Sequence, residues 1–315
     1  MTSATAVAPS AFDWGSESGV AAQLRRVIDA ATGADGRAPL NEAALLDLRH
    51  HGLVHADLWV ARSGDRLAGF ALARGVGAGA GDGEGGTTDG VEVDLVVGPS
   101  ARGQGVGTAL ADAVLDRHGR LPVSAWSHGN HPAAAALADS RGFARVRDLW
   151  LMRRPLDTPV PAPATVPSVV VRTFTPGHDE DALLRVNAAA FAHHPEQGEL
   201  TRADLEQRMA EPWFDPAGVF LAERDGELLG FHWTKVHEAP AAGEVYVVGV
   251  APAAQGMGLG KVLTLTGLRH LRDRGLPEVI LYVEAENAAA VGLYQGLGFT
   301  HADADTDVQY LRDPA

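Results

Sequence analysis

Cysteine is absent from this chain of 315 residues. Its absence excludes disulfide bonds, thiolate metal sites and a cysteine nucleophile. Lysine is nearly absent as well, since only Lys235 and Lys261 occur, and the formal net charge is −14. A protein that binds nucleic acid needs a basic face for the phosphates, so we expect no nucleic-acid partner.

Long apolar runs are also missing. No stretch approaches the ~20 apolar residues that cross a bilayer, and Met1 to Ser10 has neither a basic segment nor a long apolar run. No signal peptide is therefore evident, and we expect a cytoplasmic monomer without a membrane partner. The segment His193-His194-Pro195-Glu196 is the nearest approach to a metal site, but adjacent histidines point in different directions. We expect a loop there and no bound metal.

A strand, a glycine loop and a helix start occur twice, 153 positions apart. The second copy, Glu244 to Leu263, is a β-branched run broken at Pro252, with three alternating glycines after Gln255 and then an apolar-periodic helix. The first copy runs from Val93 to Leu110, with Arg102 in the place of Gln255. Such a loop points several unpaired backbone N–H groups at one spot, and together with the helix dipole these hold phosphate oxygens.

A repeat of this length indicates two copies of one domain, which agrees with the length of the chain. Five prolines within thirteen residues, between positions 155 and 167, predict a stiff linker. We therefore predict domains at 1–157 and 169–315, joined by a linker at 158–168. The tract from Gly75 to Gly90 carries no core-forming residues and predicts a surface loop.

Two other phosphate-binding motifs fit this pattern less well. A Walker loop needs a glycine where Gln255 stands and a serine or threonine after Lys261, and neither is present. A Rossmann fingerprint needs its third glycine later than Gly260 and an acidic partner for the ribose after a second strand. The Rossmann interpretation is kept as the minor alternative.

The motif Gln/Arg-x-x-Gly-x-Gly after a strand resembles the pyrophosphate loop of the GNAT N-acetyltransferases, which take acetyl-CoA as cosubstrate. The resemblance covers both halves and implies an α/β (α+β layered) fold of two tandem domains, each a mixed, mostly antiparallel sheet flanked by helices. It implies acetyl-CoA contacts in the second copy at Val248, Gly249, Val250, Gln255, Gly256, Met257, Gly258, Leu259, Gly260, Lys261, Asn287, Ala288, Ala289, Ala290, Val291 and Gly292. In the first copy it implies contacts at Leu95, Val96, Val97, Gly103, Gln104, Gly105, Val106, Gly107 and Thr108.

The two copies differ at two positions that matter for proton transfer. Tyr294 of the second copy aligns with Ala138, and Glu244 aligns with Val91 when the phosphate loops are superposed. In GNAT enzymes a tyrosine at the Tyr294 position commonly protonates the leaving thiolate, and a carboxylate at the Glu244 position draws the proton from the amine. We therefore predict a catalytic second domain and a degenerate first domain. Core packing for Tyr294 and a solvated strand start for Glu244 remain the structural alternatives.

Three segments are similar to signature segments of the mycothiol synthase family of tandem GNAT enzymes: Phe191 to Gly198, Phe231 to Lys235, and Leu281 to Tyr294. This resemblance implies acetylation of the cysteinyl amine of a cysteinyl-glucosaminyl-inositol. It implies contacts to this small polar amine substrate from Glu42, Glu196, Lys235, Glu244 and Tyr282. Without a cysteine, direct transfer in a ternary complex is preferred to an acetyl-enzyme. An acetyltransferase for an aminoglycoside or polyamine, and a non-enzymatic acyl-CoA sensor, stay open as alternatives.

Overall fold

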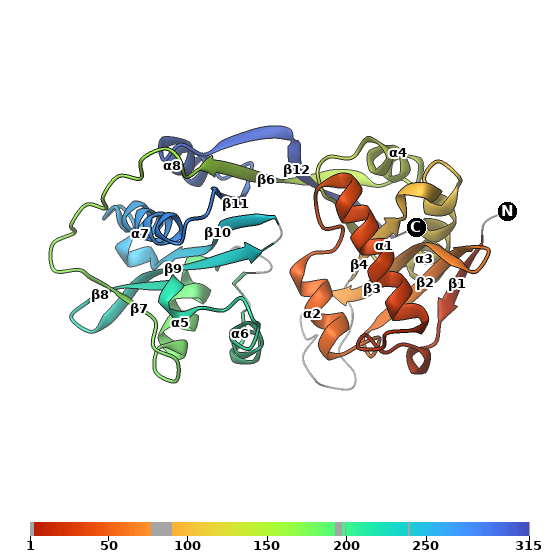
Figure 1. Ribbon diagram of the computed structural model, residues 1–315, viewed down its shortest axis with the longest axis horizontal. Coiled ribbons are helices and arrows are strands. Elements are labelled where there is room, and N and C mark those ends of the chain that lie inside the picture. Colours follow the sequence, from red (N-terminus) through yellow and green to blue (C-terminus); the bar gives the residue numbers. More distant parts are fainter. Residues whose placement is uncertain (1–2, 77–89, 193–196, 199, 239, 315) are drawn as a thin grey trace. The chain divides into compact units, whose positions relative to one another are not determined.

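The computed structural model describes residues 3–76, 90–192, 197–198, 200–238 and 240–314. The chain divides into two compact units, one formed by residues 1–149 with 302–315 and the other by residues 150–301 (Figure 1). Most of the glycine-rich tract expected as a loop, residues 77–89, lies outside the described residues. Its ends at Gly75 and Gly90 belong to strands.

The first unit contains, in chain order, β1 (Ala4–Val7), η1 (Pro9–Ala11), α1 (Gly19–Asp35), α2 (Glu42–His50), β2 (Ala56–Ser63), β3 (Arg66–Val76), β4 (Gly90–Val97), η2 (Pro99–Ala101), α3 (Val106–His118), β5 (Val123–Ser127) and α4 (Pro132–Ser140). Its strands follow the order β1-β2-β3-β4-β5, with β12 (Thr300–Arg312) next to β5 and β6 (Ala144–Pro155) beyond it. The β4–β5 pair is parallel, while β1–β2, β2–β3, β3–β4 and β5–β12 are antiparallel.

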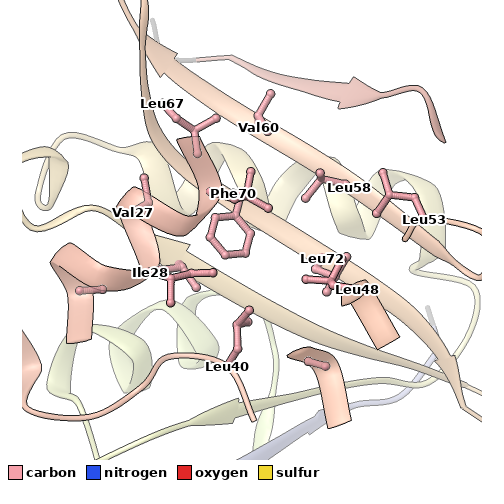
Figure 2. Close-up of a cluster of buried hydrophobic side chains, with 14 residues drawn as sticks. Val27, Ile28, Leu40, Leu48, Leu53, Leu58, Val60, Leu67, Phe70 and Leu72 are labelled. Atoms are coloured by element: carbon pink, nitrogen blue, oxygen red, sulfur yellow. The ribbon is translucent and has the colours of Figure 1, made fainter. Parts of the chain in front are cut away.

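Alternation along β3 explains how the helices cover both faces of this sheet. Phe70 and Leu72 are buried against α1 and α2, and Figure 2 shows Phe70 beside Val27 and Ile28 of α1. The intervening Ala71 belongs to a second cluster, formed with side chains of α3. The sheet therefore has one apolar core on each face.

The second unit contains, in chain order, β7 (Val170–Thr173), α5 (Glu180–Ala190), α6 (Arg202–Met209), η3 (Pro216–Gly218), β8 (Val219–Arg224), β9 (Glu227–Glu238), β10 (Ala241–Val250), η4 (Pro252–Ala254), α7 (Leu259–Asp273), β11 (Glu278–Glu284) and α8 (Ala288–Gly296). Its strand order is β6-β11-β10-β9-β8-β7. Strands β10 and β11 pair in parallel, and β7–β8, β8–β9 and β9–β10 are antiparallel. Both units thus have the expected mixed, mostly antiparallel sheet flanked by helices.

Helix α7 lies unusually close to strand β9. A Cβ atom at Gly267 of α7 would lie 2.1 Å from Cε1 of His232, so only glycine fits at this contact. His232 is fully buried, and its Nδ1 donates to the carbonyl of Leu263, also in α7, at 2.8 Å. Burial lowers the pKa of His232 to about 4, so the ring is neutral near pH 7.

The compact units differ from the predicted domain boundaries in two segments. Residues 150–157 pack in the second unit, and residues 302–315 pack in the first. Strand pairing is the reason, because β6 and β12 each begin in one unit and end in the other. Val308 of β12 lies opposite Ser127 of β5, so the end of the chain completes the sheet of the first unit.

Candidate active site

Strands β10 and β11 run side by side only where they begin. Their parallel pairing extends from Gly243 opposite Val279 to Val245 opposite Leu281, while β10 continues to Val250 on its other neighbour, β9. Beyond Val245 the two strands have no paired residues, so backbone groups on that edge of β10 are available to a ligand. This opening includes Val248 to Val250, the stretch where the sequence predicts contacts to acetyl-CoA.

The loop after β10 has the conformation that its glycines predict. Gly256 and Gly258 have φ values of 81° and 78°, and α7 starts at the next residue, Leu259. A Cβ atom at either glycine would meet nothing within 4 Å. Glycine is therefore favoured at both positions because φ is positive, and not because a side chain would clash there. The first turn of α7 leaves N–H groups at Gly260 and Lys261 without helical partners, which suits a phosphate group.

Glu244 is buried, with 7% of its surface exposed, and lies within β10 opposite Lys235 of β9. This burial excludes a solvated position at a strand start. The Nε2 atom of His237 donates to Oε2 of Glu244 at 2.6 Å. Sequence reasoning missed His237, because a histidine at the end of a strand carries no motif.

Lys235 is held by aromatic rings. Its Nζ lies 4.2 Å from the centroid of the Trp213 ring and 5.1 Å from that of Tyr246, a cation–π arrangement that keeps the ammonium over apolar surface. The hydroxyl of Tyr246 in turn accepts a hydrogen bond from Nε of Arg208 at 3.1 Å. The side chain is thus directed by its neighbours and is not a free surface lysine.

Tyr294 lies in α8 and is partly buried against the core of the second unit. Its ring packs edge-on against Phe299, with 5.8 Å between centroids. Burial raises the pKa of Tyr294 to about 12, so its hydroxyl stays protonated at neutral pH, as a proton donor must. The helix is capped by Asn287, whose side chain accepts from the Ala290 N–H at 3.1 Å.

The remaining predicted substrate residues are spread over the chain. Tyr282 is 43% exposed and lies on β11 two residues beyond Ile280, the partner of Glu244, so it shares a sheet face with Glu244. Glu42 is the first residue of α2 in the first unit, after the Asn41 cap. Glu196 lies outside the described residues. The structure therefore brings Lys235, Glu244 and Tyr282 onto one face of one sheet.

The sequence pattern of the acetyltransferase (GNAT) family matches residues 26–143 and again residues 187–299. The chain belongs to the GNAT acetyltransferase family. Both copies of the predicted repeat are thus GNAT regions, and the predicted tandem GNAT fold and enzyme class are confirmed. GNAT acetyltransferases use acetyl-CoA, which agrees with the two glycine loops.

Known proteins resemble this GNAT chain over nearly its whole length. A mycothiol acetyltransferase from Nocardioides sp. is 51% identical over 307 residues, which cover 92% of this chain and 97% of the relative. Another, from Thermobispora bispora, is 53% identical over 289 residues, covering 90% and 93%. A solved GCN5-related N-acetyltransferase from Sphaerobacter thermophilus is 26% identical, with a TM-score of 0.68 and coverage of 99% and 95%. A tandem GNAT protein from the clavulanic acid pathway is alike in fold, with a TM-score of 0.71 at 21% identity over 93% and 94% of the two chains.

The first GNAT unit has a cavity of about 580 Å³ beside its glycine loop, a volume in the range of ligand pockets. Gly103 and Gly105 have φ values of 71° and 78°, close to those of the second loop. The predicted acetyl-CoA residues that line the cavity are Leu95, Val96, Val97, Gly103, Gly105, Val106, Gly107 and Thr108. Gln104 is not among them, since its amide donates to the Ser100 carbonyl at 2.9 Å.

Two polar residues that line this cavity, and the aspartate that they contact, carry no sequence motif. Asp307, buried on β12, accepts from Nη2 of Arg37 at 2.7 Å and contacts Nδ1 of His128 at 2.9 Å. Arg37 and His128 line the cavity, and within the described part of the chain Nη1 of Arg37 and Nε2 of His128 are buried without a hydrogen-bond partner. The end of the chain thus orients two polar groups at the cavity of the first unit.

Strand register corrects one comparison between the two GNAT units. Glu92 lies opposite Arg74 in the first unit, as Glu244 lies opposite Lys235 in the second. Strand β10 contains a bulge between Val245 and Val247, whereas β4 pairs with β3 without a shift. The counterpart of Glu244 is therefore Glu92 and not Val91. The prediction that the first copy lacks this carboxylate was wrong, because spacing along the sequence does not reveal a bulge.

Surroundings of the two carboxylates nevertheless differ. Nη2 of Arg74 donates to Glu92 at 2.6 Å and to Asp94 at 3.0 Å. Burial raises the pKa of Asp94, against the opposing effect of Arg74. Glu92 is thus bound to a cation, whereas Glu244 is bound to an imidazole.

In the described residues no group of three or more candidate ligands is arranged to hold a metal ion, and no helix there is long and apolar enough to span a membrane.

Proposed function

We propose that the second unit transfers the acetyl group of acetyl-CoA directly to the cysteinyl amine of a cysteinyl-glucosaminyl-inositol, giving mycothiol. The observation that carries this proposal is the similarity to curated mycothiol acetyltransferases, about half of the residues being identical over some nine tenths of the chain. The buried Glu244 and the neutral Tyr294 support the assignment of the chemistry to the second unit.

In this mechanism Glu244 receives the proton of the attacking amine, directly or through one water molecule. The amine attacks only when neutral, and an α-amino group has a pKa near ~8, so a carboxylate can assist its deprotonation. As the C–N bond forms, backbone N–H groups of Val248 to Val250 stabilise the oxyanion. The C–S bond then breaks, and Tyr294 gives its proton to the leaving thiolate.

We assign the pyrophosphate of this acetyl-CoA to the loop from Gln255 to Lys261 and to the start of α8 at Asn287. A second acetyl-CoA would occupy the cavity of the first unit, where it does not react because Ala138 stands at the tyrosine position. Lys235, Tyr282, Glu42 and Glu196 would bind the sugar and inositol hydroxyls, which need several hydrogen bonds.

The proposal is tested by supplying acetyl-CoA with the cysteinyl pseudo-disaccharide and identifying the product by mass spectrometry. A thiol reagent is unsuitable for following CoA release, because the acceptor carries a thiol of its own. We expect one acetyl group on nitrogen and no product from polyamines or aminoglycosides. Turnover of a polyamine in place of the cysteinyl acceptor would overturn the substrate, and acetyl-CoA binding without any turnover would favour an acyl-CoA sensor.

A further inference from the structure

His237 makes the one side-chain hydrogen bond to Glu244 that the described residues show. We propose that His237 is a positioning residue, which holds the carboxylate of Glu244 by one oxygen and leaves the other for the substrate amine. This inference rests on the proposed function of the second unit, because it assigns a partner to the proposed base.

The geometry of the pair suits this task. His237 follows Lys235 by two residues on β9, so both side chains lie on the same face as Glu244 of the neighbouring strand. The hydrogen bond of 2.6 Å joins Nε2 to Oε2 and leaves Oε1 of Glu244 available. Donation from Nε2 also fixes the neutral ring in the tautomer whose Nδ1 carries no proton. His237 is 35% exposed, so it lies between the buried carboxylate and solvent.

The chemical nature of the donor matters for a base. A cation close to a carboxylate favours its ionised form and lowers its basicity, whereas a neutral donor fixes the carboxylate with a smaller effect. Lys235 lies opposite Glu244, yet its ammonium is over the rings of Trp213 and Tyr246. The hydrogen bond to Glu244 thus comes from an imidazole.

The first unit shows the contrasting arrangement. Glu92, the counterpart of Glu244, accepts from the guanidinium of Arg74, and the position that corresponds to His237 is Val76 in sequence. A carboxylate is present in both units, and among the described residues the second unit pairs it with a histidine and the first with an arginine. The exchange of partner therefore separates the unit proposed to react from the unit proposed not to react.

Other ionisable side chains lie on the same sheet face as Glu244. Strand parity places on its face Lys235 and His237 of β9, Tyr246 of β10, and Glu278, Tyr282 and Glu284 of β11. Helix α5, packed on this face, carries Glu180, Asp181 and Arg185, and Arg208 of α6 donates to the Tyr246 hydroxyl. Replacing His237 alone leaves all these groups in place.

The test compares His237→Leu with His237→Gln in the full-length protein. Leucine removes the donor, whereas the amide of glutamine restores one close to Nε2. We expect kcat to fall about 10-fold in His237→Leu and to recover to within about threefold in His237→Gln, since a small displacement of a base has effects of this size. The dissociation constant of acetyl-CoA stays within about twofold of wild type in both variants.

The matched control is His178→Gln, because His178 also contacts a carboxylate, Asp179, at 2.8 Å but is 77% exposed at its side chain. The kcat of this variant stays that of wild type, since Asp179 has no part in the proposed reaction.

The outcomes separate this inference from the proposed function. If the wild-type protein does not acetylate the cysteinyl acceptor, the proposed function fails. If the wild type turns over but His237→Leu keeps kcat within twofold, or if kcat does not recover in His237→Gln, the role of His237 is rejected. Thermal unfolding of each variant shows whether it is folded, and should His237→Leu not fold, the kcat of His237→Gln decides alone.

Discussion

The two GNAT units keep the same phosphate loop and differ in how they surround one carboxylate. The loop glycines adopt nearly equal φ values in both units. The parallel pairs β4–β5 and β10–β11 each separate after three paired residues. Glu244 is bonded to His237, whereas Glu92 is bonded to Arg74, which also holds Asp94. A tyrosine in the second unit has become Ala138 in the first. The backbone of the glycine loop is thus alike in both copies, while the side chains that we propose to handle protons differ.

A single inserted residue accompanies this divergence. The bulge in β10 puts Tyr246 out of register with β9, and its ring lies beside the ammonium of Lys235. Strand β4 has no such residue, and Arg74 reaches Glu92 and Asp94 directly. Bulges re-aim side chains next to active sites, and here the bulge accompanies the removal of the cation from the carboxylate.

The largest effect is expected for Glu244→Gln. Its amide cannot accept the amine proton, so kcat should fall about 1,000-fold, or about 4 kcal/mol in transition-state free energy. Steady-state turnover and equilibrium acetyl-CoA binding are measured together, and binding should be unaffected. Glu92→Gln in the first unit is the matched control and should retain wild-type kcat. Equal losses in the two variants would contradict the assignment of catalysis to the second unit.

Acid stability should also distinguish the units, because the second buries His232 where the first has Ala71. The folded pKa of His232, about 4, lies below the unfolded value of about 6.5. The unfolded state therefore binds the proton first, and stability is lost as the pH falls from about 6.5 to 4. The loss is about 3 kcal/mol for the second unit.

Chemical denaturation at several pH values measures this loss, with Trp213 and Trp233 as fluorescent probes in the second unit. His270 contributes in the same direction, since burial lowers its pKa as well. His232→Ala leaves a cavity and lowers stability at pH 7, but its slope between pH 6.5 and 4 should be smaller than that of wild type. An unchanged slope would show that His232 does not account for the acid sensitivity.

Local features of both units were predictable from the sequence. Asn41, Thr201 and Asn287 each cap a helix; these residue types favour that position because their side chains bond to N–H groups two or three residues away. Both glycine loops followed from the same kind of local rule. The acetyltransferase family could therefore be recognised, since its motif is a short backbone pattern.

Features that depend on pairing between distant segments were not predictable. The bulge at Tyr246 is visible only against β9, and so the true counterpart of Glu244 was missed. Strand β12 was expected to stay within the second domain, yet it pairs with β5. The contact of Asp307 with His128 joins residues 179 positions apart. Nothing in either local sequence specifies such a partner, since tertiary packing selects it.

Tyr294→Phe should lower kcat about 100-fold, a smaller effect than that of Glu244→Gln, because water can protonate part of the leaving thiolate. The pKa of Tyr294, raised by burial to about 12, predicts in addition that the wild-type kcat shows no basic limb from this group below about pH 11. Burst kinetics with acetyl-CoA in excess measure the chemical step. If Tyr294→Phe kept the wild-type kcat, Tyr294 would not be the proton donor and its role would be core packing alone.

The smallest effect, a change in affinity, compares the two loops directly. Gly105→Val and Gly258→Val each place a β-branched residue at a φ of 78°, which costs about 1–2 kcal/mol. Each change should weaken one acetyl-CoA site about 10-fold and leave the other site as in wild type. Calorimetric titration would then resolve two binding events in the wild type and one shifted event in each variant.

Turnover identifies which event belongs to which loop. Loss of kcat/KM for acetyl-CoA should follow the site weakened by Gly258→Val, because that loop precedes α7 in the unit that carries Glu244 and Tyr294. Gly105→Ala, with the smallest possible side chain, grades the effect, since it adds backbone strain with little bulk in a place where a Cβ meets nothing within 4 Å. If Gly105→Val and Gly258→Val lowered kcat/KM equally, the first loop would also serve the reaction. Acetyl-CoA bound in the first unit would then contribute to turnover, although the reacting side chains lie in the second unit.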